Sequence, residues 1–433
     1  MALLERLFKL KEQGTDVRTE LMAGFTTFLT MAYIIFVNPS ILGDAGMPKD
    51  SVFVATCIAA AIGSLIMGLY ANYPIALAPS MGLNAYFAYG VVKGMGYTWE
   101  AALGAVFISG SIFVVISVLR VRELIVRGIP PSIRIAITAG IGLFLGIVSL
   151  KSAGIIAANP ATFVTLGDLH KPQALLAIFG FFLIVALDHL RIKGAILIGI
   201  MTVTILSFVF GGNQFAGVFS APPSIDATLF KLDISGALSV GILNVVLVFF
   251  LVELFDATGT LMGVASRAGL LKEGKMERLN KALLADSGAI VAGSVLGTSS
   301  TAAYIESAAG VQAGGRTGLT AVAVAALFLG CLFIAPLAGT VPMYATAPAL
   351  FYVACLMTRE LVELNWADTT ESIPAVITAL LMPFTYSIAN GVAFGFISYA
   401  VLKMFTGRPR QAPVMVWAIA VIFVFRYAFI GAE

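Results

Sequence analysis

Long apolar segments recur along the whole chain, and they limit its possible folds more than any other feature. A helix needs about 20 mostly apolar residues to cross a bilayer, and the sequence contains fourteen runs of this kind. A further apolar stretch at 413–430 contains Arg426 and is either a last span or a helix in the membrane interface. The sequence therefore predicts an all-α polytopic membrane protein with fourteen transmembrane spans. The fourteen runs lie near residues 20–38, 52–71, 76–93, 100–119, 132–150, 172–188, 193–211, 236–262, 280–297, 299–313, 317–338, 341–357, 373–387 and 389–405.

The composition excludes most soluble functions. Only 11% of the residues are charged and 59% are hydrophobic, whereas a soluble protein carries about 25% charged residues. A soluble enzyme, a nucleic-acid-binding protein and a disordered scaffold are therefore excluded, and the net charge of +3 is too small to indicate a polyanionic partner. Cys57, Cys331 and Cys355 lie in apolar runs without the spacing of metal ligands, so we expect no disulfide framework, no zinc site and no cofactor.

The basic residues indicate the orientation in the membrane. If the N-terminus is cytoplasmic, fourteen crossings place 20 of the 26 Lys and Arg residues on the cytoplasmic side. Positive charge is retained on that side of cell membranes, so the split supports both the number of spans and their direction. The first segment has no apolar stretch with a cleavage site, and we expect no removed signal peptide. The six outward residues are Lys49, Lys93, Lys151, Lys171, Lys231 and Arg426.

The two halves of the chain resemble each other. Seven runs precede the segment 213–235 and seven follow it, and repeats with an odd number of spans must insert in opposite orientations. The segment 78–91 (APSMGLNAYFAYGV) aligns without gaps with 298–311 (TSSTAAYIESAAGV), and four positions are identical. Both segments belong to the third span of their half. The sequence therefore predicts two inverted seven-helix repeats.

These two spans also carry the residues that interrupt helices. Pro74, Pro79 and Gly82 disrupt any helix that began earlier in the third span, and the tenth span contains GlyThrSerSerThr at 297–301. Non-helical backbone at membrane depth is tolerated only where it is buried in protein or lines a cavity. We therefore expect half-helices preceded by short extended segments in spans 3 and 10, with N–H donors meeting near the midplane.

Four carboxylates lie inside predicted spans of the second half: Glu253, Asp256, Asp286 and Glu306. Each charged side chain at the membrane centre costs about 2.5–3.5 kcal/mol on insertion scales, and no Lys or Arg in these spans is placed to neutralise them. The acids are therefore candidates for function, although some of them could instead cap a helix or bridge two helices. Polar aromatic residues suit a flat ligand, and we expect Asn84, Tyr86 and Tyr304 to face the same centre.

Four motifs connect the chain with a known family: AGFTTFLTMAYIIFVNP at 23–39, PSMGLNAYFAY at 79–89, ELFDATGTL at 253–261 and GTSSTAAYIESAAGV at 297–311. The chain resembles the AzgA-like purine permeases, a branch of the nucleobase–ascorbate transporter superfamily, over nearly its whole length. The resemblance implies purine uptake driven by protons and dimerisation through gate helices. It also implies a core domain at 1–120 and 236–338, a gate domain at 121–212 and 339–405, and a hydrophobic tail at 406–433.

The resemblance assigns roles to individual residues. Asp256 matches the eighth-span carboxylate that hydrogen-bonds the base, and Glu306 matches the tenth-span ligand residue, which is a glutamine in xanthine and urate relatives. Thr260 stands where a uracil-transporting relative has histidine, and Ser307 replaces an asparagine of the xanthine and urate relatives, which argues against xanthine, urate and uracil as cargo. The expected substrate-binding residues are Asp256, Glu306, Asn84, Thr260, Ser307, Tyr304, Tyr86 and Ser300. The expected proton-coupling residues are Asp256, Asp286, Glu306 and Glu253.

The sequence thus predicts a secondary transporter of the inner or plasma membrane that imports adenine, guanine or hypoxanthine with protons. A transporter or exchanger of anions, of the sulfate or bicarbonate type, is an alternative on the same architecture, although Glu306 would repel an anion. A membrane-embedded enzyme is disfavoured because no His, Cys or metal cluster accompanies the acids.

Overall fold

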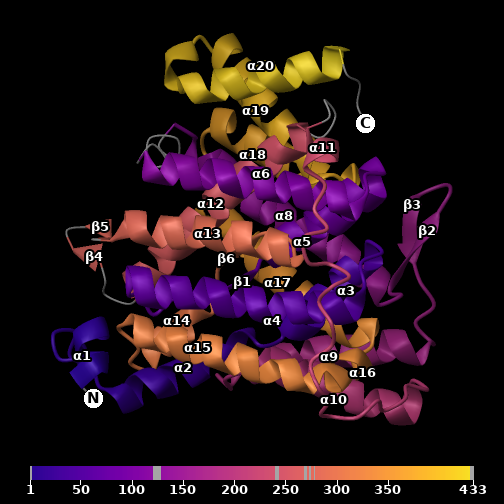
Figure 1. Cartoon of the computed structure of the whole chain (residues 1–433). Helices are drawn as coiled ribbons and strands as arrows, with labels where there is room; N and C mark the ends of the chain where they lie inside the picture. Colours follow the sequence, from indigo (N-terminus) through magenta and orange to yellow (C-terminus); the bar gives the residue numbers. More distant parts are fainter. Residues whose placement is uncertain are drawn as a thin grey trace.

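The computed structural model describes residues 2–119, 128–238, 243–267, 271–272, 275–276 and 278–429, and most of them are helical (Figure 1). The elements of the first half are α1 Ala2–Phe8, α2 Val17–Met31, α3 Ile34–Asp44, α4 Lys49–Ile66, the π-helix η1 Met67–Ala71, β1 Leu77–Pro79, α5 Met81–Ala85, the π-helix η2 Tyr86–Gly94, α6 Trp99–Val118, α8 Pro131–Ser152, β2 Ile156–Asn159, β3 Phe163–Leu166, α9 Pro172–His189 and α10 Ala195–Phe210.

The second half begins with the short helix α11 and the long helix α12, and it ends at α20 near the C-terminus (Figure 1). Its elements are α11 Ile234–Ala237, α12 Leu243–Arg267, β4 Leu271–Lys272, β5 Lys275–Met276, α13 Leu279–Leu296, β6 Thr301–Ala303, α14 Ser307–Gln312, α15 Gly318–Gly330, the 3₁₀-helix η3 Cys331–Ile334, α16 Ala335–Thr340, α17 Met343–Thr358, the 3₁₀-helix η4 Arg359–Glu363, α18 Thr369–Phe384, α19 Ile388–Phe405, the 3₁₀-helix η5 Pro409–Gln411 and α20 Val414–Phe429.

The helical prediction is confirmed. Ten helical segments of the described residues are long and apolar enough to cross a membrane, and they lie over ten of the predicted runs. The runs at 193–211 and 373–387 form the shorter apolar helices α10 and α18. The runs at 76–93 and 299–313 are divided into a short strand and a short helix, as their sequences predict. The count of fourteen spans stays a prediction, and Arg120, Arg122 and Arg127, predicted to be cytoplasmic, lie outside the described residues.

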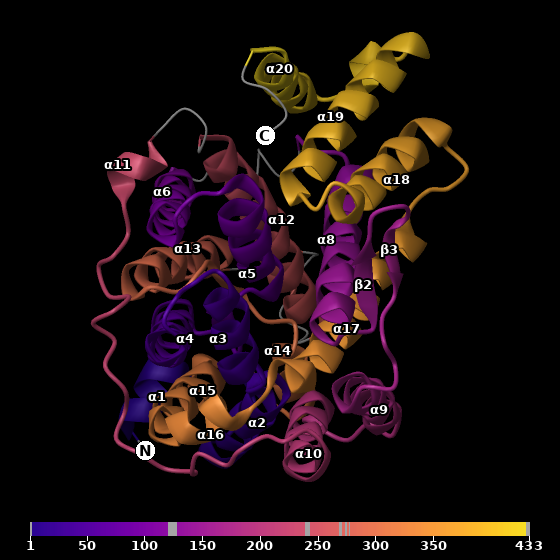
Figure 2. The ribbon, with the colours of Figure 1, turned by 90° about the vertical axis from the view of Figure 1, so that its right-hand side faces the viewer.

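The helices pack in two groups, which Figure 2 shows next to each other. In one group, α13 packs against α4 and α6, and α15 packs against α2 and α4. In the other group, α8 packs against α17 and α18, α9 packs against α10 and α17, and α18 packs against α19. Helix α12 contacts α6 and α13 of the first group as well as α8 and α19 of the second. It therefore lies where the two groups meet.

The two broken spans join each other through an antiparallel pair of strands, β1 and β6. Leu77 lies opposite Ala303 and Pro79 lies opposite Thr301. The pairing continues beyond the strands, because the Ser80 N–H donates to the Ser300 carbonyl at 2.9 Å and the Tyr304 N–H donates to the Ala76 carbonyl at 3.0 Å. Equivalent segments of the two halves thus lie side by side in opposite directions, which is the arrangement that an inverted repeat requires.

Left-handed residues end the helices that precede both strands. Gly297 has φ 94° at the C-terminal cap of α13, and Asn72 has φ 52° at the end of η1. Glycine and asparagine adopt this conformation at the lowest cost, and it stops a helix by turning the chain away from the axis. The extended segment can then begin within the protein, where Thr298, Ser299 and Ser300 are fully buried.

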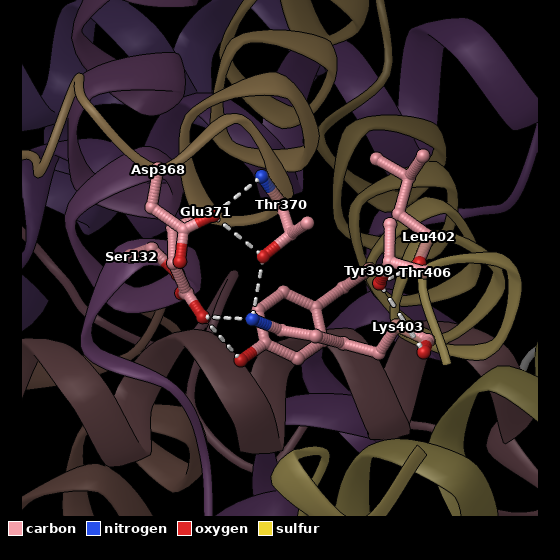
Figure 3. Close-up of polar contacts among 8 residues, drawn as sticks. All are labelled: Ser132, Asp368, Thr370, Glu371, Tyr399, Leu402, Lys403 and Thr406. Carbon is pink, nitrogen blue, oxygen red and sulfur yellow. Dashed lines mark hydrogen bonds and ion pairs between the residues drawn. The ribbon is translucent and has the colours of Figure 1, made fainter. Parts of the chain in front are cut away.

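A buried ion pair connects the helices of the second group (Figure 3). The ammonium of Lys403 on α19 lies 2.7 Å from Glu371 Oε1 on α18, and the side chains are 2% and 22% exposed. Tyr399 donates to Glu371 Oε1 at 2.7 Å, Ser132 donates to Glu371 Oε2 at 2.5 Å, and Lys403 donates to the Thr370 hydroxyl at 2.7 Å. Both carboxylate oxygens therefore have partners. A cavity of about 390 Å³ borders this cluster.

We expect Gly318→Ala to destabilise the protein. A Cβ at Gly318, the first residue of α15, would overlap the backbone carbonyl of Gly68 in η1, and neither backbone can move away freely. Overpacking of this kind costs about 1–3 kcal/mol. The midpoint of thermal unfolding in detergent should therefore fall. Gly330→Ala, at the other end of the same helix, meets no atom within 4 Å and should leave the midpoint unchanged or raised. Equal midpoints for the two variants would contradict this packing.

We also expect Lys403→Met to be strongly destabilising, because it leaves the Glu371 carboxylate without its cation. Breaking a buried ion pair costs about 3–5 kcal/mol, whereas replacing both partners by apolar residues is often neutral. The double variant Lys403→Met/Glu371→Met should therefore unfold at a higher temperature than Lys403→Met alone. Lys9→Met removes an exposed pair with Glu12 and is the control, since exposed pairs contribute only about 0–1 kcal/mol. A double variant less stable than Lys403→Met would contradict the pairing.

Candidate functional site

Asp256 meets the broken third span. It lies near the middle of α12, its side chain is partly buried, and Ser80 donates a hydrogen bond to its Oδ2 at 3.1 Å. Ser80 is the residue between β1 and α5, where the extended segment changes into a helix. The eighth span thus places its carboxylate directly at the interruption of the third span.

Glu306 lies at the equivalent interruption of the tenth span, immediately before α14. Its side chain makes no capping hydrogen bond with that helix, so the capping alternative does not apply to it. Instead, the Tyr33 hydroxyl donates to Glu306 Oε1 at 2.6 Å. Two residues earlier, the Tyr304 hydroxyl donates to the Pro79 carbonyl at 2.6 Å. Side chains from spans 1 and 10 therefore lie next to the β1–β6 pair.

Glu253 and Asp286 lie in different surroundings. Glu253 is buried one turn before Asp256 on α12, but its Oε2 accepts a hydrogen bond from Ser109 on α6 at 2.7 Å. This contact bridges two helices, as the structural alternative for this acid expects. Asp286 is fully buried on α13, which packs between α4 and α6. Their assignment to proton coupling stays a prediction.

The other expected binding residues lie at or near the two breaks. Asn84 is fully buried on α5, and its amide oxygen and nitrogen have no hydrogen-bond partner among the described residues. The Ser307 hydroxyl accepts the Ala76 N–H at 3.0 Å, so it supports the strand pair. Tyr86 packs edge-on against Phe249 with ring centroids 4.9 Å apart. Ser300 is buried and Thr260 is partly buried. Their roles in binding stay predictions.

Exposed residues lie near both acids along the chain. Gly259, one turn beyond Asp256, is exposed, and no atom lies where its Cβ would contact a neighbour. Ile305, next to Glu306, is 50% exposed, although Ala302, Ala303 and Tyr304 before it are buried. Exposed residues therefore lie close in the sequence to both Asp256 and Glu306, whereas the strand pair beside the acids is buried.

Asp256 and Glu306 have no ion-pair partner within the described ranges, in contrast to Glu371 with its Lys403. A carboxylate in this setting can accept N–H donors of a ligand, and once protonated it can donate a hydrogen bond. Within the part of the chain that the structure describes, no group of three or more His, Cys, Asp or Glu residues could hold a metal ion. Both protonation states of these two carboxyl groups can therefore form hydrogen bonds.

Tyr33 is the site residue that sequence reasoning did not single out. It lies in the motif at 23–39 and is fully buried between α2 and α3. A tyrosine hydroxyl in the middle of an apolar run needs a buried partner, and this signal was available in the sequence. The identity of the partner was not, because Glu306 is 273 residues away.

The fold is shared with solved transporters. The transmembrane domain of a cyanobacterium bicarbonate transporter, BicA, matches with a TM-score of 0.66 and 17% identity, over 86% of this chain and 97% of that chain. The murine anion transporter Slc26a9 in the inward-facing state also matches with a TM-score of 0.66, at 12% identity, over 94% of this chain and 72% of that chain. At such identities the likeness describes the fold alone.

Sequence comparison is more specific. The adenine permease AdeP of Escherichia coli (strain K12) is 51% identical over 432 residues, which cover 100% of this chain and 97% of the relative. The guanine/hypoxanthine permease PbuO of Bacillus subtilis (strain 168) is 44% identical, over 96% of this chain and 98% of the relative. Permeases are transporters, not enzymes. A model of the Permease family matches residues 18–394. The chain therefore belongs to this permease family of multi-pass membrane proteins.

Proposed function

We propose that this permease imports a purine nucleobase, namely adenine, guanine or hypoxanthine, by proton symport. The observation that carries the proposal is the position of Asp256 and Glu306: two carboxylates from spans 8 and 10 lie at the two ends of the β1–β6 pair without a basic partner in the described residues. The names of the adenine and guanine/hypoxanthine permeases at 51% and 44% identity support the choice of cargo.

The base is proposed to bind at the interruption of spans 3 and 10. Purine bases carry ring N–H and exocyclic amino or carbonyl groups on their edges, and carboxylates accept from such donors strongly. The Asn84 amide can both donate and accept, and no described residue satisfies it. Thr260, one turn beyond Asp256 on the same helix face, extends the polar surface. Tyr304, Tyr86, Ser300 and Ser307 complete the proposed surroundings of the base.

Proton coupling follows from the cost of an ionised carboxylate inside a membrane. A proton on each of Asp256 and Glu306 removes both negative charges, so the loaded site is neutral and can change its access without carrying a charge across a low-dielectric layer. Glu253 and Asp286 are proposed as further proton-coupling acids. Glu253 is the weaker candidate, since Ser109 already holds it against α6.

Alternating access is proposed to arise from movement between two domains. The core comprises 1–120 and 236–338, the gate comprises 121–212 and 339–405, and 406–433 is a separate tail. With a cytoplasmic N-terminus in the inner membrane, the ends of α3, η2 and α8 lie outside. There Tyr89 donates to Asp44 Oδ2 at 2.8 Å, which joins the ends of α3 and η2.

An anion transporter on this architecture is the competing proposal. A homodimer formed through the gate helices is proposed for either function. The uncompensated carboxylates favour a neutral nitrogen heterocycle, because an anion would be repelled by Glu306 and Asp256. Excess sulfate or bicarbonate should therefore not compete with purine uptake. Strong competition by either anion would favour the anion transporter.

The main test is uptake of labelled adenine, guanine and hypoxanthine into proteoliposomes. An inward proton gradient should drive accumulation of at least one of them, and a sodium gradient of equal size should not. Accumulation under the sodium gradient alone would refute proton coupling. Failure of all three bases under both gradients would refute the proposed cargo.

We expect Asp256→Asn and Glu306→Gln each to lower purine uptake about tenfold or more, since each removes a charge-assisted hydrogen bond worth about 1.5–3 kcal/mol. The amount of protein in the membrane should not change. Asp168→Asn, in an exposed loop whose carboxylate contacts His170, is the control and should retain full uptake. Normal uptake by both site variants would refute the assignment of these two acids.

A further inference from the structure

We infer that Tyr33 is a positioning residue of the substrate site and that it acts by orienting Glu306. The inference rests on the proposed function, and it assigns a part of the site to the first span, which contributes none of the candidate residues that the sequence indicates.

The first span is interrupted at the level of the site. Helix α2 ends at Met31 and α3 begins at Ile34, and Tyr33 lies between them. Its side chain is fully buried, and its hydroxyl donates to Glu306 Oε1 at 2.6 Å. One turn earlier, the Thr30 hydroxyl lies 3.4 Å from the Glu306 carbonyl. The interruption of span 1 thus contacts both the side chain and the backbone of the same residue.

Tyr33 gives the Glu306 carboxylate its one side-chain hydrogen bond among the described residues. Glu306 does not cap α14, so without Tyr33 its carboxylate would have no fixed direction. A charge-assisted hydrogen bond of 2.6 Å lies in the range of the strong O–H···O⁻ bonds. It occupies Oε1 and leaves Oε2 available to a ligand or a proton. A ligand that meets an oriented carboxylate does not have to order it on binding.

The gate contains a matched pair that shows what a purely structural tyrosine–glutamate contact looks like. Tyr399 donates to Glu371 Oε1 at 2.7 Å, which is nearly the same bond (Figure 3). There Lys403 neutralises the charge and Ser132 occupies the second oxygen. The gate cluster is therefore complete without a ligand. The Tyr33–Glu306 pair has neither a cation nor a donor for Oε2 in the described residues. Glu306 Oε2 is therefore available to a ligand, as a binding site requires.

The test is equilibrium binding of labelled purine to the purified, detergent-solubilised transporter. Tyr33→Phe removes only the hydroxyl and should raise the Kd about tenfold, the loss expected for one charge-assisted hydrogen bond. Tyr399→Phe is the matched control, because it removes the equivalent hydroxyl in the gate and should leave the Kd unchanged. In the Glu306→Gln background, Tyr33→Phe should change the Kd less than about twofold, because the two residues act as one unit.

Three results would overturn the inference: an unchanged Kd for Tyr33→Phe, an equal rise for Tyr399→Phe, or the full tenfold rise in the Glu306→Gln background. If Glu306→Gln binds no measurable purine, the comparison of Tyr33→Phe with Tyr399→Phe decides. A chain that binds and transports no purine at all would refute the proposed function instead. The two failures are therefore distinguishable.

Discussion

The pairing of β1 with β6 is the interaction on which the centre of this protein depends. Inside a membrane, each backbone group without a hydrogen bond costs several kcal/mol, because no water can replace the missing partner. A span interrupted by Pro74 and Pro79 leaves such groups, and so does the extended segment before α14. Each broken span supplies the partners that the other lacks, from Ala76 with Tyr304 to Ser80 with Ser300. Two interruptions that would each be costly alone are thereby stable together.

This pairing also explains why the carboxylates lie where they do. An extended segment is narrower than a helix, so it leaves room beside itself for side chains from neighbouring spans. Asp256 and Glu306 occupy that room, and each is held by one hydroxyl, from Ser80 and Tyr33. Around α18 and α19, by contrast, the Glu371 carboxylate is fully partnered by Lys403, Tyr399 and Ser132. A carboxylate beside the strand pair thus has one hydroxyl donor among the described residues, whereas Glu371 has a cation and two hydroxyl donors.

Much of this arrangement could be predicted from the sequence, since it depends on local patterns. The lengths of the apolar runs predicted fourteen spans, and ten helical segments of the described residues have the length of a span. Pro and Gly residues located the two interruptions. Contacts between distant spans could not be read in this way. Glu253 and Asp256 are three residues apart on one helix, yet Glu253 contacts Ser109 on α6 while Asp256 contacts Ser80. Lys403 was counted only as a cytoplasmic charge, because nothing in its own run indicates Glu371 as its partner.

The contacts at the centre also constrain how access to the site can change. The Ser307 hydroxyl holds the Ala76 N–H, and the Tyr304 hydroxyl holds the Pro79 carbonyl, so β1, β6 and the start of α14 are fixed to one another. A movement that separated spans 3 and 10 would break these bonds together with the strand pair. We therefore expect any change of access to leave the strand pair intact, so that a base bound beside it would move together with spans 3 and 10.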